Sequence, residues 1–191
     1  FYVMDFTQTD ERNRLSDYES LLYLDTAASR IDFRYTAPLS YSCAGTGMAF
    51  FRSSWEDNAF WASFQSGGEH LCGHQNLDQG HITINYLGKD ILIDAGMWRE
   101  EIAGGGRIRN FSPASFWHNT IMVESGASGT PIPQTPYGER KALAFEDTGD
   151  YLYARAEITG AYSQGGGENA PQIRKVEREI IYIRPTAIVV I

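Results

Sequence analysis

Short runs of alternating apolar and polar residues dominate the chain from about residue 33 onward. The clearest run spans residues 81–87; it is followed by Gly88-Lys89-Asp90 and a second, more apolar run over 91–96. Strict alternation and a glycine-bearing turn predict a β-hairpin. Further strands are expected over residues 59–65, 119–123, 141–145, 151–158, 176–183 and 186–191, with a turn at 146–150. This pattern is typical of an all-β, antiparallel β-sandwich.

The first thirty residues have a different pattern, in which apolar residues recur at helical spacing. One helix is predicted there, with a face formed by Leu15, Tyr18, Leu21, Leu22 and Ala27. We therefore expect residues 1–32 to be a helical linker or the end of a preceding domain, and residues 33–191 to form the sandwich. The last residues, 187–191, are an apolar run that resembles a strand, so we expect a fragment truncated at its C-terminus.

Two long loops interrupt the strand pattern. Residues 97–117 contain a triple glycine, three arginines and several aromatic residues, and residues 125–140 are rich in Gly and Pro. Long loops in a compact domain are more often functional than incidental. The arginines Arg99, Arg107 and Arg109 are candidates for binding an anionic ligand, and the alternative is a solvated loop face.

Length and charge narrow the classes of function. The chain has 191 residues, which suits one ordinary domain, and a formal net charge of −8 argues against indiscriminate binding to nucleic acid. No run of about 18 apolar residues occurs, so no membrane-spanning helix is expected. The two cysteines, Cys43 and Cys72, form no Cys-x-x-Cys pair, which leaves both one disulfide and two free thiols open.

Polar residues of metal-binding or acid-base type gather around the predicted hairpin. Three of the four histidines, His70, His74 and His81, lie just before or at its start, although a polar loop ahead of a strand would look the same. Asp94 follows an apolar run and needs a metal, an arginine or several donors, unless it only caps the turn with Gly96. His118 precedes another apolar run. If these segments are neighbours, His74 or Asn76 could converge with Asp94 and His118 on one metal.

Three motifs in order resemble the heparinase II/III family of polysaccharide lyases. They are the string 74–80, which is similar to the family's His-x-His-x-Asp element, the Asp-x-Gly of 94–96, and His118-Asn119-Thr120; residues 176–191 resemble the strand pair that follows. The resemblance implies a supersandwich-type β-sandwich that packs on an N-terminal α/α toroid. The two parts would form a cleft for an acidic polysaccharide.

The resemblance also implies roles for individual residues. It places a structural zinc at Asn76, Asp94 and His118, and it places His74 near the substrate as the catalytic residue of this part. Asn76 stands where the family has a histidine, and an amide oxygen is a poor ligand for zinc but an acceptable one for calcium. His81 or His74 could take its place.

The implied reaction is β-elimination at a uronate of a heparin/heparan sulfate-like or alginate-like polysaccharide. Arg99, Arg107, Arg109 and Trp117 would bind the substrate, and the remaining catalytic groups would lie on the toroid. A bacterial periplasmic or secreted enzyme is implied, and a homodimer is an open arrangement. Two alternatives remain: a non-catalytic carbohydrate-binding sandwich, in which Trp98, Phe116, Trp117 and Tyr137 stack on sugars, and a structural domain whose polar motif is a hydrogen-bonded corner.

Overall fold

A computed structural model describes residues 31–68, 76–94, 96, 115–124, 126, 129–136, 138–162 and 173–191. The chain forms two compact units, Phe1–Pro38 and Leu39–Ile191. The described part of the first unit contains one short 3₁₀ helix, η2 (Phe33–Tyr35), which Asp32 caps by accepting a hydrogen bond from the backbone N–H of Arg34. The helix predicted within residues 1–30 lies outside the described residues, and the domain division at residue 32 stays a prediction.

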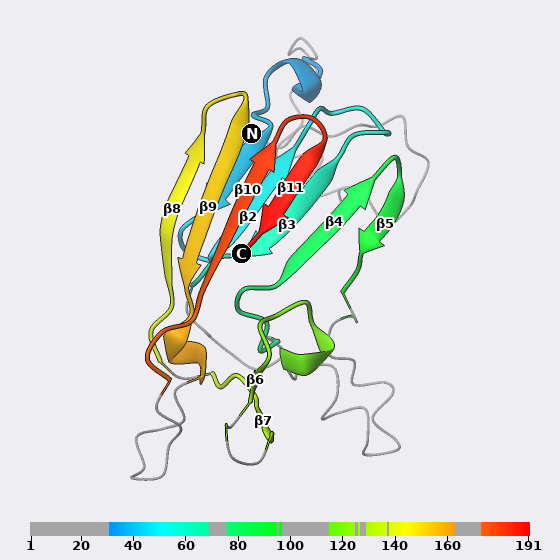
Figure 1. Ribbon diagram of the computed structural model, residues 1–191. Coiled ribbons are helices and arrows are strands. Elements are labelled where there is room, and N and C mark those ends of the chain that lie inside the picture. The colour runs from blue at the N-terminus through cyan, green and yellow to red at the C-terminus, as the bar shows by residue number, and fades with distance from the viewer. Residues whose placement is uncertain are drawn as a thin grey trace, which may run out of the picture. The chain divides into compact units, whose positions relative to one another are not determined.

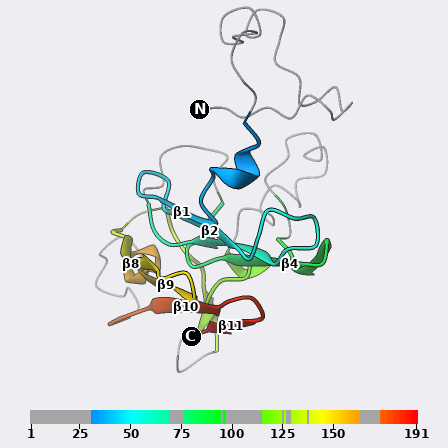
Figure 2. The ribbon, with the colours of Figure 1, turned by 90° about the horizontal axis from the view of Figure 1, so that it is seen from above.

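Antiparallel sheets make up the second unit, which confirms the predicted all-β sandwich. The five-stranded sheet has its strands in chain order, β1 (Ser40–Cys43), β2 (Met48–Arg52), β3 (Trp61–Gln65), β4 (Ile82–Tyr86) and β5 (Lys89–Leu92). The four-stranded sheet has the order β11 (Ala187–Val190), β10 (Glu177–Ile183), β9 (Tyr151–Glu157) and β8 (Lys141–Asp147). A two-stranded ribbon joins β6 (Val123–Glu124) and β7 (Pro131–Ile132). The two larger sheets face one another, as the view from above shows (Figures 1 and 2).

Alternate residues of the facing strands form one apolar core. Ala49 and Phe51 of β2 point inward from one sheet, and Ile180 and Tyr182 of β10 point inward from the other. The Tyr182 ring stacks on Phe60 at a centroid distance of 4.4 Å and lies 5.7 Å from Phe51. Aromatic contacts of this kind add to the hydrophobic stabilisation that holds the two sheets together.

The predicted hairpin is confirmed as β4 and β5, with a tighter turn than expected. Leu87 and Gly88 both have positive φ, 55° and 69°, which is the backbone of a two-residue turn, and the register shifts between Ile84 and Asn85. The strand expected over 119–123 is reduced to β6, because the backbone N–H groups of Asn119 and Thr120 bond to His81 Nδ1 and His118 O and not to the backbone of a neighbouring strand. Strands β1 and β2 were not predicted.

An ion pair between Asp147 and Arg184 joins the end of β8, the start of β1 and the β10–β11 turn. The Asp147 carboxylate accepts hydrogen bonds from both terminal nitrogens of Arg184, at 2.7 and 2.6 Å, from Ser40 Oγ at 2.5 Å and from the Gly149 N–H at 2.9 Å. Burial alone would raise the pKa of Asp147, but these hydrogen bonds together outweigh it and lower the pKa to about 2. The end of β8 is thereby tied to β1 and to the β10–β11 turn.

We expect this pair to make the fold sensitive to acid. Because the pKa of Asp147 is lower in the folded chain than the ordinary 3.8, its stabilisation is complete above about pH 4 and is lost as the pH falls towards 2. Asp147→Asn should lower the free energy of unfolding at pH 7 by about 1–2 kcal/mol and reduce the loss of stability between pH 4 and 2. Denaturant titrations across that range measure it. Asp150→Asn, in the same turn, is the control, and an equal pH profile for both variants would contradict the assignment.

Candidate metal centre

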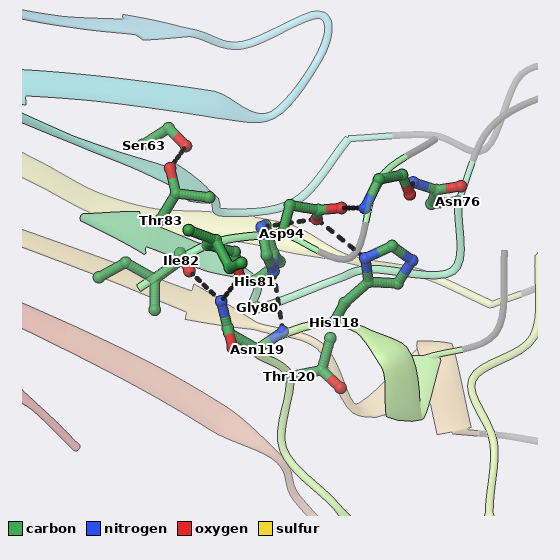
Figure 3. Close-up of polar contacts among 12 residues, drawn as sticks. Ser63, Asn76, Gly80, His81, Ile82, Thr83, Asp94, His118, Asn119 and Thr120 are labelled. Atoms are coloured by element: carbon green, nitrogen blue, oxygen red, sulfur yellow. Dashed lines mark hydrogen bonds and ion pairs between the residues drawn. The ribbon is translucent and has the colours of Figure 1, made fainter. Parts of the chain in front are cut away.

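Side chains from three separate segments converge beside the start of β4 (Figure 3). His81 immediately precedes β4, Asp94 lies two residues after β5, and His118 follows the 3₁₀ helix η5 (Ser115–Trp117). His81 Nε2 and His118 Nδ1 each lie 2.9 Å from the same atom, Asp94 Oδ2. One donor atom from each residue fits within 4.8 Å of the others, which makes this cluster a candidate site for a metal ion.

The carboxylate of Asp94 joins a tight turn to both imidazoles. Its Oδ1 accepts a hydrogen bond of 2.5 Å from the Gly96 N–H, and Gly96 has a φ of +108°, a conformation that favours glycine. The side chain of Asp94 is 28% exposed, whereas those of His81 and His118 are 8% and 0% exposed. The sequence left a turn-capping role and a partnered role as alternatives for Asp94, and the structure combines them.

His81 is held as a neutral imidazole. Burial, followed by the neighbouring His118 and Arg178, lowers its pKa to about 4, and the opposing attraction of Asp94 is smaller than burial. Its Nδ1 accepts a hydrogen bond of 3.0 Å from the Asn119 N–H. Its Nε2 is fully buried and makes no hydrogen bond, although Asp94 Oδ2 is close, because the contact is poorly aligned for one. A buried nitrogen without a hydrogen-bond partner is unusual and calls for an explanation such as an ion.

Asn119 binds the three segments to one another. Its side-chain amide donates to the carbonyl of Ile82 at 3.0 Å and to that of Ile93 at 2.7 Å, while its backbone N–H reaches His81. The adjacent Thr120 hydroxyl donates to Ser115 O at 2.7 Å, which closes η5. In the His-Asn-Thr motif, His118 therefore belongs to the cluster, Asn119 links the segments that contain Ile82 and Ile93, and Thr120 holds the loop at Ser115.

Gln134 is a further structural residue of the site, and no feature of the sequence indicated it. This buried side chain accepts from the Gln79 N–H at 2.8 Å and donates to Gln79 O and to Tyr162 Oη, while its own N–H donates to Ser115 Oγ. These bonds hold the η5 loop against the segment that leads to His81. Gln134 lies in a Gly- and Pro-rich loop whose composition predicted a loop but not a buried contact.

The structure brings together part of the site predicted from sequence. Asp94 and His118 are in the cluster, and His81, one of the two proposed substitutes, occupies the third position. Asn76 Nδ2 lies 3.5 Å from Gly96 O, and Asn76 Oδ1 is buried without a hydrogen-bond partner. Trp117 is in η5 and its ring lies 5.6 Å from that of Phe116. The other predicted site residues, His74, Arg99, Arg107 and Arg109, lie outside the described residues.

The donor chemistry of the cluster fits zinc better than calcium. Two imidazole nitrogens and one carboxylate oxygen are ligands typical of zinc, whereas calcium takes oxygen ligands. A neutral imidazole has one lone pair, so metal binding through His81 Nε2 would move the ring proton to Nδ1 and displace the hydrogen bond from Asn119. That loss costs about 1–3 kcal/mol, which is small beside the roughly 10–16 kcal/mol of a structural zinc site.

Comparison with known proteins gives matches among solved structures alone. No family model matches the chain, and no curated protein matches it. A heparinase III gene product matches with a TM-score of 0.61 and 20% identity over 81% of this chain. A heparan sulfate lyase from Pedobacter heparinus, solved as a mutant, matches with a TM-score of 0.54 and 18% identity over 81% of this chain. This chain shares the fold of a segment of heparinase III.

The match extends across most of this chain but covers a small part of each lyase. The chain spans 22% of the length of the first heparinase III structure and 21% of a second, which it matches with a TM-score of 0.55 and 16% identity. At these identities the comparison establishes the fold. Among the described residues, no helix is long and apolar enough to cross a membrane.

Proposed function

We propose that this chain is the β-sandwich part of a polysaccharide lyase that acts on a uronate-containing acidic polysaccharide. The observation that carries the proposal is the convergence at one site of Asp94 and His118, from two motifs far apart in the sequence. The sequence predicted this convergence only on the condition that the segments are neighbours. The fold shared with heparan sulfate lyases supports the same conclusion.

A zinc ion held by His81, Asp94 and His118 is part of the proposal, with calcium as the less suitable ion. Bound there, the ion would fasten together three segments of the sandwich, a structural role that requires no contact with substrate. His81 supplies an imidazole whose burial lowers its pKa to about 4 and whose buried Nε2 makes no hydrogen bond, so it can act as a metal ligand once the ring proton moves to Nδ1. Asn76 then need not be a ligand.

The proposed reaction is β-elimination. A base removes the proton at C5 of the uronate, the C4–O bond breaks as the C4=C5 double bond forms, and an acid protonates the leaving oxygen. From this part of the enzyme, His74 would act beside the uronate carboxylate, and Arg99, Arg107 and Arg109 would hold the polyanion against a chain of net charge −8. The remaining groups would come from an α/α toroid of a longer parent protein.

Encounter with a large polyanion implies a place outside the cytoplasm, so we propose a periplasmic or secreted protein. The homodimer stays a prediction.

One observation favours a second candidate function, a non-catalytic carbohydrate-binding module: Phe116 and Trp117 are adjacent aromatic residues, 47% and 43% exposed. Exposed aromatic rings can stack on sugar rings, and this pair would serve a binding module as well as it would serve a lyase.

Product analysis with the longer parent protein separates the two candidates. A lyase should release conjugated, unsaturated uronate ends, detected by ultraviolet absorbance, from heparan sulfate or alginate and none from a neutral polysaccharide. Trp117→Ala should lower the rate through weaker substrate binding, seen as a higher KM by up to about tenfold. Sugar binding without unsaturated product would support the binding module, and neither binding nor product would leave a structural domain.

A further inference from the structure

An arginine of the four-stranded sheet, Arg178, binds backbone carbonyls next to two histidines of the candidate metal centre. Arg178 lies in β10, in the four-stranded sheet, whereas His81 immediately precedes β4 of the five-stranded sheet. Arg178 Nη1 donates a hydrogen bond of 2.6 Å to Gly80 O and a second hydrogen bond to Asn119 O. Each of these carbonyls belongs to a residue adjacent to a histidine of the cluster, Gly80 to His81 and Asn119 to His118.

Gly80 has a left-handed backbone conformation beside this arginine, and a side chain there would crowd Ile158. Gly80 has a φ of +80°, and a Cβ at that position would lie 2.8 Å from Ile158 Cδ1 and 3.6 Å from Arg178 Cδ. The Gly80 N–H donates to Gln65 O at 2.9 Å, so β3 holds its N–H while Arg178 holds its carbonyl. The backbone that enters His81 is therefore fixed from both sheets.

The guanidinium of Arg178 has no carboxylate partner within the described part of the chain, and its described hydrogen bonds go to these two carbonyls. A partly buried cation of this kind carries a desolvation cost, and an apolar side chain at such a site is often as stable or more so. Stabilisation of the fold alone is therefore a weak reason for an arginine here. Both hydrogen bonds come from one terminal nitrogen, Nη1, whose two N–H groups let it hold two fixed acceptors at once.

We infer that Arg178 is a positioning residue of the metal centre, which sets the His81 and His118 rings through the Gly80 and Asn119 carbonyls. In the metal-free site Asn119 is the shared element, because its N–H bonds to His81 while its carbonyl is held by Arg178. The four-stranded sheet, which contributes no residue to the cluster, thus determines the cluster's geometry. This inference rests on the proposed metal site and adds a residue that the site's own sequence motifs do not contain.

The test compares zinc affinity in Arg178 variants of the full chain by competition with a chelator. Arg178→Met keeps the alkyl stem and removes both hydrogen bonds, and it should weaken zinc binding by about 10–100-fold, the range for groups that orient ligands. Arg178→Lys should recover part of that loss. Arg155→Met is the matched control, because Arg155 lies on the neighbouring strand β9 and pairs with Glu177 and Glu179, away from the cluster.

A second readout keeps the positioning role separate from the metal proposal. NMR of the imidazole rings in metal-free protein should show shifted His81 and His118 resonances in Arg178→Met and partial restoration in Arg178→Lys, with no change in Arg155→Met. If the unsubstituted chain binds no zinc, the metal proposal fails and the ring spectra still decide the role of Arg178. Unchanged ring spectra in folded Arg178→Met, or in Arg178→Gln where Arg178→Met does not fold, would overturn the inference.

Discussion

Asp94→Ala should abolish zinc binding by this chain. Asp94 Oδ2 is the atom that both imidazoles contact, at 2.9 Å each, so its removal takes away one ligand and the group that aligns the other two. We expect the zinc affinity to fall by at least about 1,000-fold, since three ligands share the roughly 10–16 kcal/mol of a structural zinc site. Zinc content after dialysis and the zinc-dependent rise in Tm measure this loss.

The same variant should also be less stable without metal. It removes the hydrogen bonds to the Gly96 N–H and to His118 Nδ1 and leaves polar groups without partners, which costs about 2–3 kcal/mol. Asp90→Ala is the matched control on the same hairpin, because Asp90 accepts a hydrogen bond from Asn85 and lies outside the cluster. Near-stoichiometric zinc in Asp94→Ala would mean that the ion binds elsewhere.

The pattern of apolar and polar residues predicted the strands in which that pattern is clear over several residues. The alternation over 81–87 gave the β4–β5 hairpin, and the long runs after residue 140 gave β8 to β11. Strands β1 and β2 were not predicted because Ser, Cys, Ala and Gly between residues 40 and 49 weaken the alternation. Their pairing with one another, and that of β2 with β3, stabilises strands that the local sequence does not indicate.

The residues of the candidate site were likewise predictable from the sequence only in part. Asp94 and His118 could be selected because each is a polar residue beside an apolar run, where it needs a partner. The motifs indicated which three segments could meet, but not which side chain of the first segment reaches the other two. Arg178 could not be found from the sequence, because its bond to Gly80 spans 98 residues and depends on how the two sheets pack.

A comparison of His81→Ala with Asn76→Ala should identify the third arm of the site. The imidazole of His81 is neutral, and its buried Nε2 lies 2.9 Å from Asp94 Oδ2. Asn76 Nδ2 lies 3.5 Å from Gly96 O, and Asn76 is not part of the cluster. We expect His81→Ala to weaken zinc binding by about 300–8,000-fold, since one third of roughly 10–16 kcal/mol is about 3–5 kcal/mol. Asn76→Ala should change it by less than about threefold. Chelator competition at pH 7 measures both.

A double variant makes this assignment sharper. In the resembled family a histidine occupies the position of Asn76, so His81→Ala combined with Asn76→His tests whether a ligand at either position can complete the site. If His81→Ala loses zinc binding and the double variant recovers it, a histidine at either position 76 or position 81 can complete the same site. A larger loss in Asn76→Ala than in His81→Ala would contradict the assignment, and the buried Asn76 Oδ1 would then be the better candidate ligand.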